Sequence, residues 1–264
     1  MSAIKGVLID LSGTIHIDTK VIPGAIEAIQ RLKESKIPFK FATNTTKVSS
    51  KKLVQKLTNL GFNVEEKDVF TSLSACHDLI KTSHLRPMLF MEDAAMEEFK
   101  EIDTNNPNAV VIGLAPSKFN YNQLNDAFRL LTSDPNHGIP LIAVHKAKYF
   151  ADKDEKLSLG PGGFVQVLEF ATGITAKVVG KPTVDFFKLA LKQIDMENRP
   201  QEVAIIGDDV INDLGGGAQE LGLHRFLVQT GKYREEDSKA SENVNVFKSV
   251  VEAIDYIIDQ YNHP

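Results

Sequence analysis

Short apolar runs that end in polar loops recur near both ends of this 264-residue chain, and they constrain its fold more than any other feature. Val7–Ile9 leads into Asp10, and Val203–Ile206 leads into Gly207–Asp209. An apolar run this short, without alternating polar residues, is typical of a strand buried on both faces of a parallel sheet. A segment with apolar residues at helical spacing follows the first strand, and the alternation returns near the carboxyl end. The chain is therefore predicted to be an α/β protein with a doubly wound parallel sheet.

The middle of the chain repeats this pattern on a smaller scale. Three strand-like segments are each followed by a helical pattern: Pro87–Met91, Ala109–Leu114 and Pro140–Val144. We predict that residues 81–178 form a smaller α/β domain, inserted into a larger domain made of residues 1–80 and 179–264.

Two narrower expectations concern individual elements. The third helical pattern of the inserted domain places Val165, Leu168 and Phe170 at helical spacing, so these side chains are expected in its core. Arg225–Val228 is expected to be the last strand of the larger sheet, after a helix over residues 214–221.

Charge and composition exclude several classes of protein. Lys and Arg number 30 against 35 Asp and Glu, and this net charge of −5 predicts neither nucleic-acid binding nor docking on an anionic membrane. The longest apolar stretch, residues 109–116, is far shorter than the ~20 residues of a membrane span. Cys76 is the single cysteine, so no intramolecular disulfide can form, and it is expected to be a small buried side chain. The first strand begins too early to leave room for a leader, so a cytoplasmic protein is expected.

Polar residues follow several of the predicted strands. In open α/β sheets, ligands bind beyond the carboxyl ends of the strands, where the strand order reverses. This rule selects three loops: Asp10–Thr14, Thr43–Thr46 and Gly207–Asp209. Neighbouring strands lie about 4.8 Å apart, so Asp10 and Asp208 would face one small volume if their strands are adjacent.

Two carboxylates that close repel each other unless a cation or a proton lies between them. Mg²⁺, a hard ion with oxygen ligands, would relieve the repulsion and attract phosphate oxygens. Lys181 lies where a helix should begin, so its ammonium would add to the helix N-terminal amides. The Thr43 hydroxyl and the Asn44 amide would supply further contacts to a phosphoryl group. These parts together predict phosphoryl transfer.

Four motifs in this order resemble the signature of the haloacid dehalogenase superfamily of phosphohydrolases. They are Asp-Leu-Ser-Gly-Thr at 10–14, Thr-Asn at 43–44, Gly-Lys-Pro at 180–182 and Gly-Asp-Asp-x-x-x-Asp at 207–213. The inserted segment resembles the α/β (C2-type) cap of one subgroup, with a Rossmann-like core around it. The resemblance covers nearly the whole chain.

The resemblance implies a role for each matched residue. Asp10 would be the nucleophile that forms an aspartyl phosphate, and Mg²⁺ would be bound by Asp10, Asp208 and the main-chain carbonyl of Ser12. Asp213 would support the metal site, and Asp209 is a weaker candidate for the same role. The phosphoryl group would contact Ser12, Thr43, Asn44, Thr45, Lys47 and Lys181, where Lys47 is equally explained as a surface lysine. The cap residues His145, Lys146 and Lys148 are left without an assigned role.

Ser12 departs from the family pattern. Most family phosphatases carry Asp here, which protonates the leaving oxygen and then activates water, and a serine hydroxyl cannot do this near neutral pH. Loss of a positioned acid–base group typically costs ~10²–10⁴-fold in rate. We therefore expect substrates with better leaving groups, such as phosphoramidates or pyrophosphate, to be favoured over simple monoesters.

Two other functions remain open from the sequence. The chain could be a non-hydrolytic module that binds a phosphate ligand or a phosphoprotein through a retained metal site. The lack of an Asp at position 12 favours this alternative, whereas the presence of Asp10, which binding alone would not require, argues against it. Haloalkanoate dehalogenation is disfavoured, because that chemistry uses no metal and would not need Asp208. The expected partner is a small phosphorylated substrate or a phosphorylated side chain. The physiological substrate is not encoded in any motif, and a homodimer through the cap is one option for the oligomeric state.

Overall fold

The computed structural model describes residues 3–134, 138–151, 156–236 and 243–262. Its larger sheet has the strand order β14-β13-β12-β1-β4-β5. The bounds of these strands are β1 Gly6–Ile9, β4 Phe39–Thr43, β5 Val69–Thr71, β12 Val203–Gly207, β13 His224–Val228 and β14 Val244–Phe247. The predicted doubly wound α/β fold is confirmed, with one addition: β14 pairs in parallel with β13, so Arg225–Val228 is not the last strand.

Strand β1 lies at the point where the strand order reverses. It pairs in parallel with β12 on one side, with Ile9 opposite Ile206, and with β4 on the other side. All four of its residues are buried, as expected for a strand covered on both faces. The loops that follow β1 and β12 therefore begin side by side at the edge where such sheets bind ligands.

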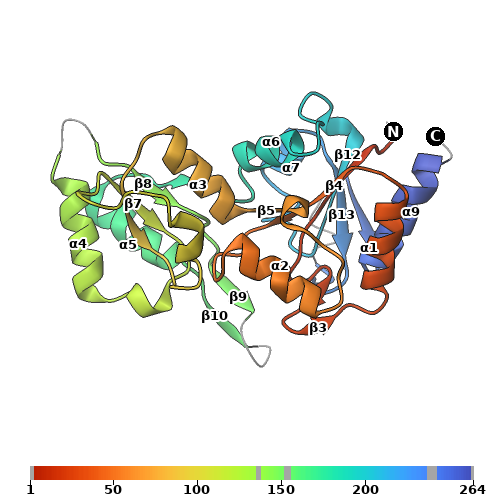
Figure 1. Ribbon diagram of the computed structural model, residues 1–264, viewed down its shortest axis with the longest axis horizontal. Coiled ribbons are helices and arrows are strands. Elements are labelled where there is room, and N and C mark those ends of the chain that lie inside the picture. Colours follow the sequence, from red (N-terminus) through yellow and green to blue (C-terminus); the bar gives the residue numbers. More distant parts are fainter. Residues whose placement is uncertain (1–2, 135–137, 152–155, 237–242, 263–264) are drawn as a thin grey trace. The chain divides into compact units, whose positions relative to one another are not determined.

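Helices cover this sheet (Figure 1). Their bounds are α1 Ala25–Glu34, α2 Ser50–Asn59, α6 Val184–Lys192, α7 Gly217–Glu220 and α9 Val250–Asn262, with short 3₁₀ segments at Glu66–Asp68 and Pro200–Glu202. Helices α1 and α9 lie side by side (Figure 1), and an ion pair of 2.6 Å joins Arg31 to Asp255 across them. Helix α7 is shorter than the helix predicted over residues 214–221, because Gly215 and Gly216 precede it and Gly216 has a positive φ of 47°. A small antiparallel pair, β2 His16–Ile17 with β3 Lys20–Val21, follows the first loop.

A second sheet has the order β11-β8-β7-β6, and its strand pairs are parallel. Its strands are β6 Pro87–Phe90, β7 Ala109–Ile112, β8 Leu141–Ala143 and β11 Lys177–Val178; a hairpin is made of β9 Tyr149–Ala151 and β10 Leu157–Leu159. The accompanying helices are α3 Ser72–Thr82, α4 Tyr121–Thr132 and α5 Gly162–Thr172, with 3₁₀ segments at Met96–Phe99 and Pro116–Lys118. Helices α4 and α5 lie next to each other (Figure 1) and share an apolar core with this sheet.

The sequence pattern predicted one residue, Phe170, wrongly as part of the core of this second sheet. Val165 and Leu168 are buried in the core, but 89% of Phe170 is exposed. Helix α5 is apolar around much of its circumference, so its periodicity did not distinguish the two faces.

By mutual contact the chain divides into two compact units. The first comprises residues 1–43, 53–70 and 181–264, and the second comprises residues 44–52 and 71–180. The division into domains at residues 1–80, 81–178 and 179–264 stays a prediction. Within the described ranges, no helix is both long and apolar enough to cross a membrane.

Candidate active site

Three buried carboxylates converge within the first unit. Asp10 follows β1, Asp208 follows β12, and Asp213 lies five residues beyond Asp208. One carboxylate oxygen from each lies within 4.8 Å of the other two. The backbone N–H of Asp10 donates to the carbonyl of Ile206 at 2.9 Å, which continues the ladder between the two strands to the site itself. The two strands are adjacent, which was the condition for the sequence prediction, and Asp10 and Asp208 lie together.

Lys181 lies between two of these acids. Its Nζ is 2.6 Å from Oδ1 of Asp10 and 2.6 Å from Oδ1 of Asp213, and the side chain is buried. Burial alone would lower the pKa of Lys181, but Asp10 and Asp213 outweigh it and raise that pKa, so the ammonium stays charged. One ammonium among three carboxylates leaves an excess of negative charge.

The electrostatics of the other two acids fit a site for a cation. Burial, with Asp213 and Asp10 adding to it, raises the pKa of Asp208 well above its ordinary value. Burial and the charge of Asp10 raise the pKa of Asp213 to about 6. Carboxylates with raised pKa values hold protons unless a cation compensates them, and hard divalent ions prefer oxygen ligands. The donor set therefore fits a divalent metal ion.

Asp209 is turned away from the carboxylate cluster and into its own loop. Its Oδ1 accepts the N–H groups of Ile211 and Asn212, and its Oδ2 accepts the side-chain amide of Asn212 at 2.8 Å. Lys232 Nζ lies 3.0 Å from the same Oδ2, and despite burial these partners lower the pKa of Asp209. Asp209 reaches the cluster through its backbone, because its N–H donates to Oδ2 of Asp213 at 3.1 Å.

The remaining predicted residues of the first unit are Ser12 and Thr43. The side chain of Ser12 is exposed, in the loop directly after Asp10, whereas Thr43 is buried as the last residue of β4. Gly13, next to Ser12, has a positive φ of 95°, and a Cβ at this position would lie 2.0 Å from Oδ2 of Asp208. Only glycine therefore allows the first loop to approach Asp208 this closely.

The other predicted residues belong to the second unit. Asn44 and Thr45 are half-buried at its start, and Lys148 is exposed. Lys47 Nζ lies 3.9 Å from the centre of the Phe150 ring, a cation–π contact. Lys146 forms an ion pair of 2.7 Å with Glu169.

His145 is buried in a small polar network of the second unit. Its Nε2 lies 3.3 Å from Oγ1 of Thr46, and its Nδ1 accepts the N–H of Ala147 at 3.3 Å. Because Nδ1 accepts, the neutral ring carries its proton on Nε2 and donates it to Thr46. The network attaches the chain after Thr45 to the strand end at His145.

Sequence reasoning missed the turn after β13. The backbone N–H of Lys232 donates to Oδ2 of Asp208 at 2.7 Å, and Thr230 Oγ1 donates to the carbonyl of Gly13 at 2.5 Å. The signal was present, because this turn also follows the carboxyl end of a strand, and β13 is next to β12.

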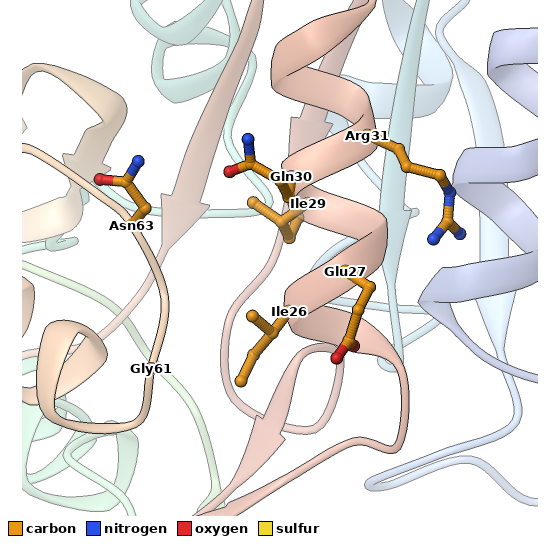
Figure 2. A pocket seen from close by; sticks show the side chains of 7 residues that line it. All are labelled: Ile26, Glu27, Ile29, Gln30, Arg31, Gly61 and Asn63. Carbon is orange, nitrogen blue, oxygen red and sulfur yellow. The ribbon is translucent and has the colours of Figure 1, made fainter.

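Two other features of the structure involve none of the predicted site residues. A surface pocket of about 340 Å³ is lined by α1, Gly61 and Asn63, and none of the predicted site residues lines it (Figure 2). Arg31 points away from Asn63 there and pairs with Asp255 (Figure 2).

Cys76 is buried, and burial raises the pKa of its thiol to about 12, as expected for an unreactive side chain.

Comparison with known proteins defines the class. A family model described as haloacid dehalogenase-like hydrolase matches residues 7–105, and one described as HAD-hydrolase-like matches residues 178–253. The chain belongs to the haloacid dehalogenase-like hydrolases, as its four motifs predicted.

Individual relatives match nearly the full length. The haloacid dehalogenase-like hydrolase domain-containing protein 2 of Bos taurus is 48% identical, over 97% of this chain and 96% of that protein. The human phospholysine phosphohistidine inorganic pyrophosphate phosphatase is 38% identical, over 92% of this chain and 89% of its own. The crystal structure of a 4-nitrophenylphosphatase from Thermotoga maritima is similar, with a TM-score of 0.84 at 26% identity, and covers 96% of this chain and 97% of that one.

Proposed function

We propose that this chain is a Mg²⁺-dependent phosphohydrolase in which Asp10 is the nucleophile. The observation that carries the proposal is the convergence of three buried acids, Asp10, Asp208 and Asp213, of which Asp10 and Asp213 share the ammonium of Lys181. Such a cluster suits an ion that also binds phosphate oxygens. The names of the human and the Thermotoga relatives, both phosphatases, support the same reaction class.

In the first step, a carboxylate oxygen of Asp10 attacks phosphorus and the bond to the leaving group breaks, which leaves an aspartyl phosphate. In the second step, water attacks that phosphorus, inorganic phosphate departs, and the carboxylate is regenerated. Lys181 holds Oδ1 of Asp10 and so fixes the orientation of the nucleophile. A divalent ion held by Asp10, Asp208 and the main-chain carbonyl of Ser12 would neutralise charge on the phosphoryl oxygens.

The remaining residues would bind and orient. Asp213 would orient Lys181, to which it is bonded, and Asp209 would fix Asp213 through its backbone N–H. The proposed contacts to the phosphoryl group come from Ser12, Thr43, Asn44, Thr45, Lys47 and Lys181. A cytoplasmic location and a homodimer through the cap stay predictions.

The proposed substrate class follows from Ser12. With no carboxylic acid at this position, the leaving group has no positioned proton donor in the first loop, so its own stability decides the rate. Phosphoramidates and pyrophosphate meet this requirement better than alkyl phosphate esters do. The human relative at 38% identity is named for phospholysine, phosphohistidine and pyrophosphate, which supports this class.

A substrate panel tests the proposal. Wild type, Asp10→Asn and the surface control Asp255→Asn would be assayed for phosphate release from pyrophosphate, a phosphoramidate and a sugar phosphate, with Mg²⁺ and with a chelator. We expect release only with Mg²⁺, a preference for the first two substrates, full activity of Asp255→Asn, and a loss of ~10⁴-fold or more in Asp10→Asn. Equal activity of Asp10→Asn and wild type would contradict the nucleophile. Saturable binding without release, by contrast, would favour a phosphate-binding module.

A further inference from the structure

The turn Thr230–Tyr233, which follows β13, contacts two loops of the candidate site. It is closed by a hydrogen bond of 3.1 Å from the N–H of Tyr233 to the carbonyl of Thr230. Within it, the Thr230 hydroxyl donates to the carbonyl of Gly13, and the N–H of Lys232 donates to Oδ2 of Asp208. The turn thus joins the loop of the proposed nucleophile to the proposed metal ligand of the adjacent strand.

Steric constraints act on the same carboxylate oxygen. A Cβ on Gly231, which has a φ of 58°, would lie 2.1 Å from Oδ2 of Asp208 and 2.5 Å from Cα of Gly13. A Cβ on Gly13 would lie 2.0 Å from that oxygen. Oδ2 of Asp208 is therefore enclosed by two glycines and bonded to one N–H, so the carboxylate cannot rotate freely.

The side chain of Lys232 completes the arrangement. Its Nζ pairs with Asp209, whose N–H donates to Asp213. Through its backbone and its side chain, Lys232 therefore contacts the two consecutive aspartates of the fourth motif.

We propose that Thr230, Gly231 and Lys232 are positioning residues that set the affinity of Asp208 for the divalent ion without contacting substrate. This inference rests on the proposed metal-dependent function. Partners that orient a metal ligand typically change affinity 10–100-fold when they are removed. Thr230 is the residue to test, because its hydroxyl can be deleted without a change of shape.

The experiment measures Mg²⁺ affinity by calorimetry on metal-free protein, together with circular dichroism and the rate of pyrophosphate hydrolysis. Thr230→Val removes the hydroxyl and is expected to raise the Kd for Mg²⁺ ~10-fold, with activity restored by excess Mg²⁺. Thr230→Ser keeps the hydroxyl and should bind as wild type does. The matched control is Tyr233→Phe, because the Tyr233 hydroxyl contacts Gln229 and not the site.

Gly231→Ala provides a second variant, expected to weaken Mg²⁺ binding more than Thr230→Val does, because the new Cβ meets Asp208 directly. A folded Thr230→Val protein with wild-type Mg²⁺ affinity would overturn the inference, and so would equal loss in Thr230→Ser. If wild type itself binds no Mg²⁺, the proposed function fails, and that result is distinct from a failure of the turn alone.

Discussion

The two compact units differ in how their charged and polar side chains are compensated. In the second unit, each of three predicted residues has a partner of its own: Lys146 pairs with Glu169, Lys47 lies over the Phe150 ring, and His145 contacts Thr46. In the first unit, three buried acids converge, and only two of them, Asp10 and Asp213, contact Lys181. Paired groups hold a structure, whereas an uncompensated cluster has capacity left for a ligand. The comparison locates the proposed chemistry in the first unit.

Removing the shared lysine should have the largest effect. Lys181→Met leaves Asp10 and Asp213 without their common partner, and breaking a buried pair this way typically costs ~3–5 kcal/mol of unfolding free energy. Activity should fall ~10²–10³-fold, because a charged donor to the phosphoryl group is lost. Urea unfolding and phosphate release measure the two effects.

Lys146→Met is the matched control in the second unit. Its ion pair is part-exposed, with 32% of the lysine side chain accessible, so the cost should stay within ~0–1 kcal/mol. Equal destabilisation by the two substitutions would remove the contrast between the units.

Restoring the missing acid should have the next largest effect. Ser12→Asp is expected to raise turnover of a simple phosphate monoester by ~10²-fold, because it supplies a proton donor for the leaving group. Mg²⁺ affinity should change little, since the proposed ligand at this residue is the main-chain carbonyl. Steady-state kinetics on a sugar phosphate and on pyrophosphate would check this, and an unchanged monoester rate would mean that Ser12 does not limit the reaction.

The effect of Mg²⁺ on stability should depend on pH. Asp213 ionises near 3.8 when unfolded, whereas burial and Asp10 raise its pKa to about 6 in the folded protein. The folded state therefore holds more protons between these values, and the stability from this group, present below pH 4, is lost as the pH rises through 6. A divalent ion at the neighbouring Asp10 and Asp208 would favour the ionised form of Asp213, so Mg²⁺ should stabilise the protein more at pH 8 than at pH 5.

At a concentration 100-fold above its Kd, Mg²⁺ should contribute ~2.7 kcal/mol, or a Tm increase of about 5–10 °C for a chain of this size. Thermal unfolding at pH 5 and pH 8, with and without Mg²⁺, measures the difference. The same increase at both pH values would show that metal binding and the protonation of Asp213 are not coupled.

The loops of the site could be predicted because parallel strands end at a common edge. Asp10 and Asp208 come after uninterrupted apolar runs, so the sequence predicted that both lie at this edge, whereas the structure supplied the adjacency of their strands. The turn at Thr230–Lys232 was missed because its contacts with Asp208 use a backbone N–H and the close approach of a glycine, and neither leaves a pattern of side-chain types.

Two errors have a common physical cause. The edge strand β14 has a polar residue, Asn245, between Val244 and Val246, and none of its residues is fully buried, so it lacks the uninterrupted apolar run that marked the central strands. Phe170 lies on a helix whose apolar residues extend around both faces, so the sequence did not show which face is buried. The pairing of an edge strand and the buried face of an apolar helix both depend on contacts between distant segments, and local sequence patterns do not record such contacts.

The exposed face of α5 gives the smallest expected effect. Phe170 is 89% exposed, whereas Leu168, two residues earlier on the same helix, is 1% exposed. Phe170→Ser should therefore change the free energy of unfolding by less than ~0.5 kcal/mol, against ~2–5 kcal/mol for Leu168→Ala. Thermal unfolding of dilute and concentrated samples of both variants measures this. If Phe170→Ser instead destabilises the protein strongly, and more so in concentrated samples, a second copy of the chain covers this face. The two units would then differ in their surfaces as well as in how their charged side chains are compensated.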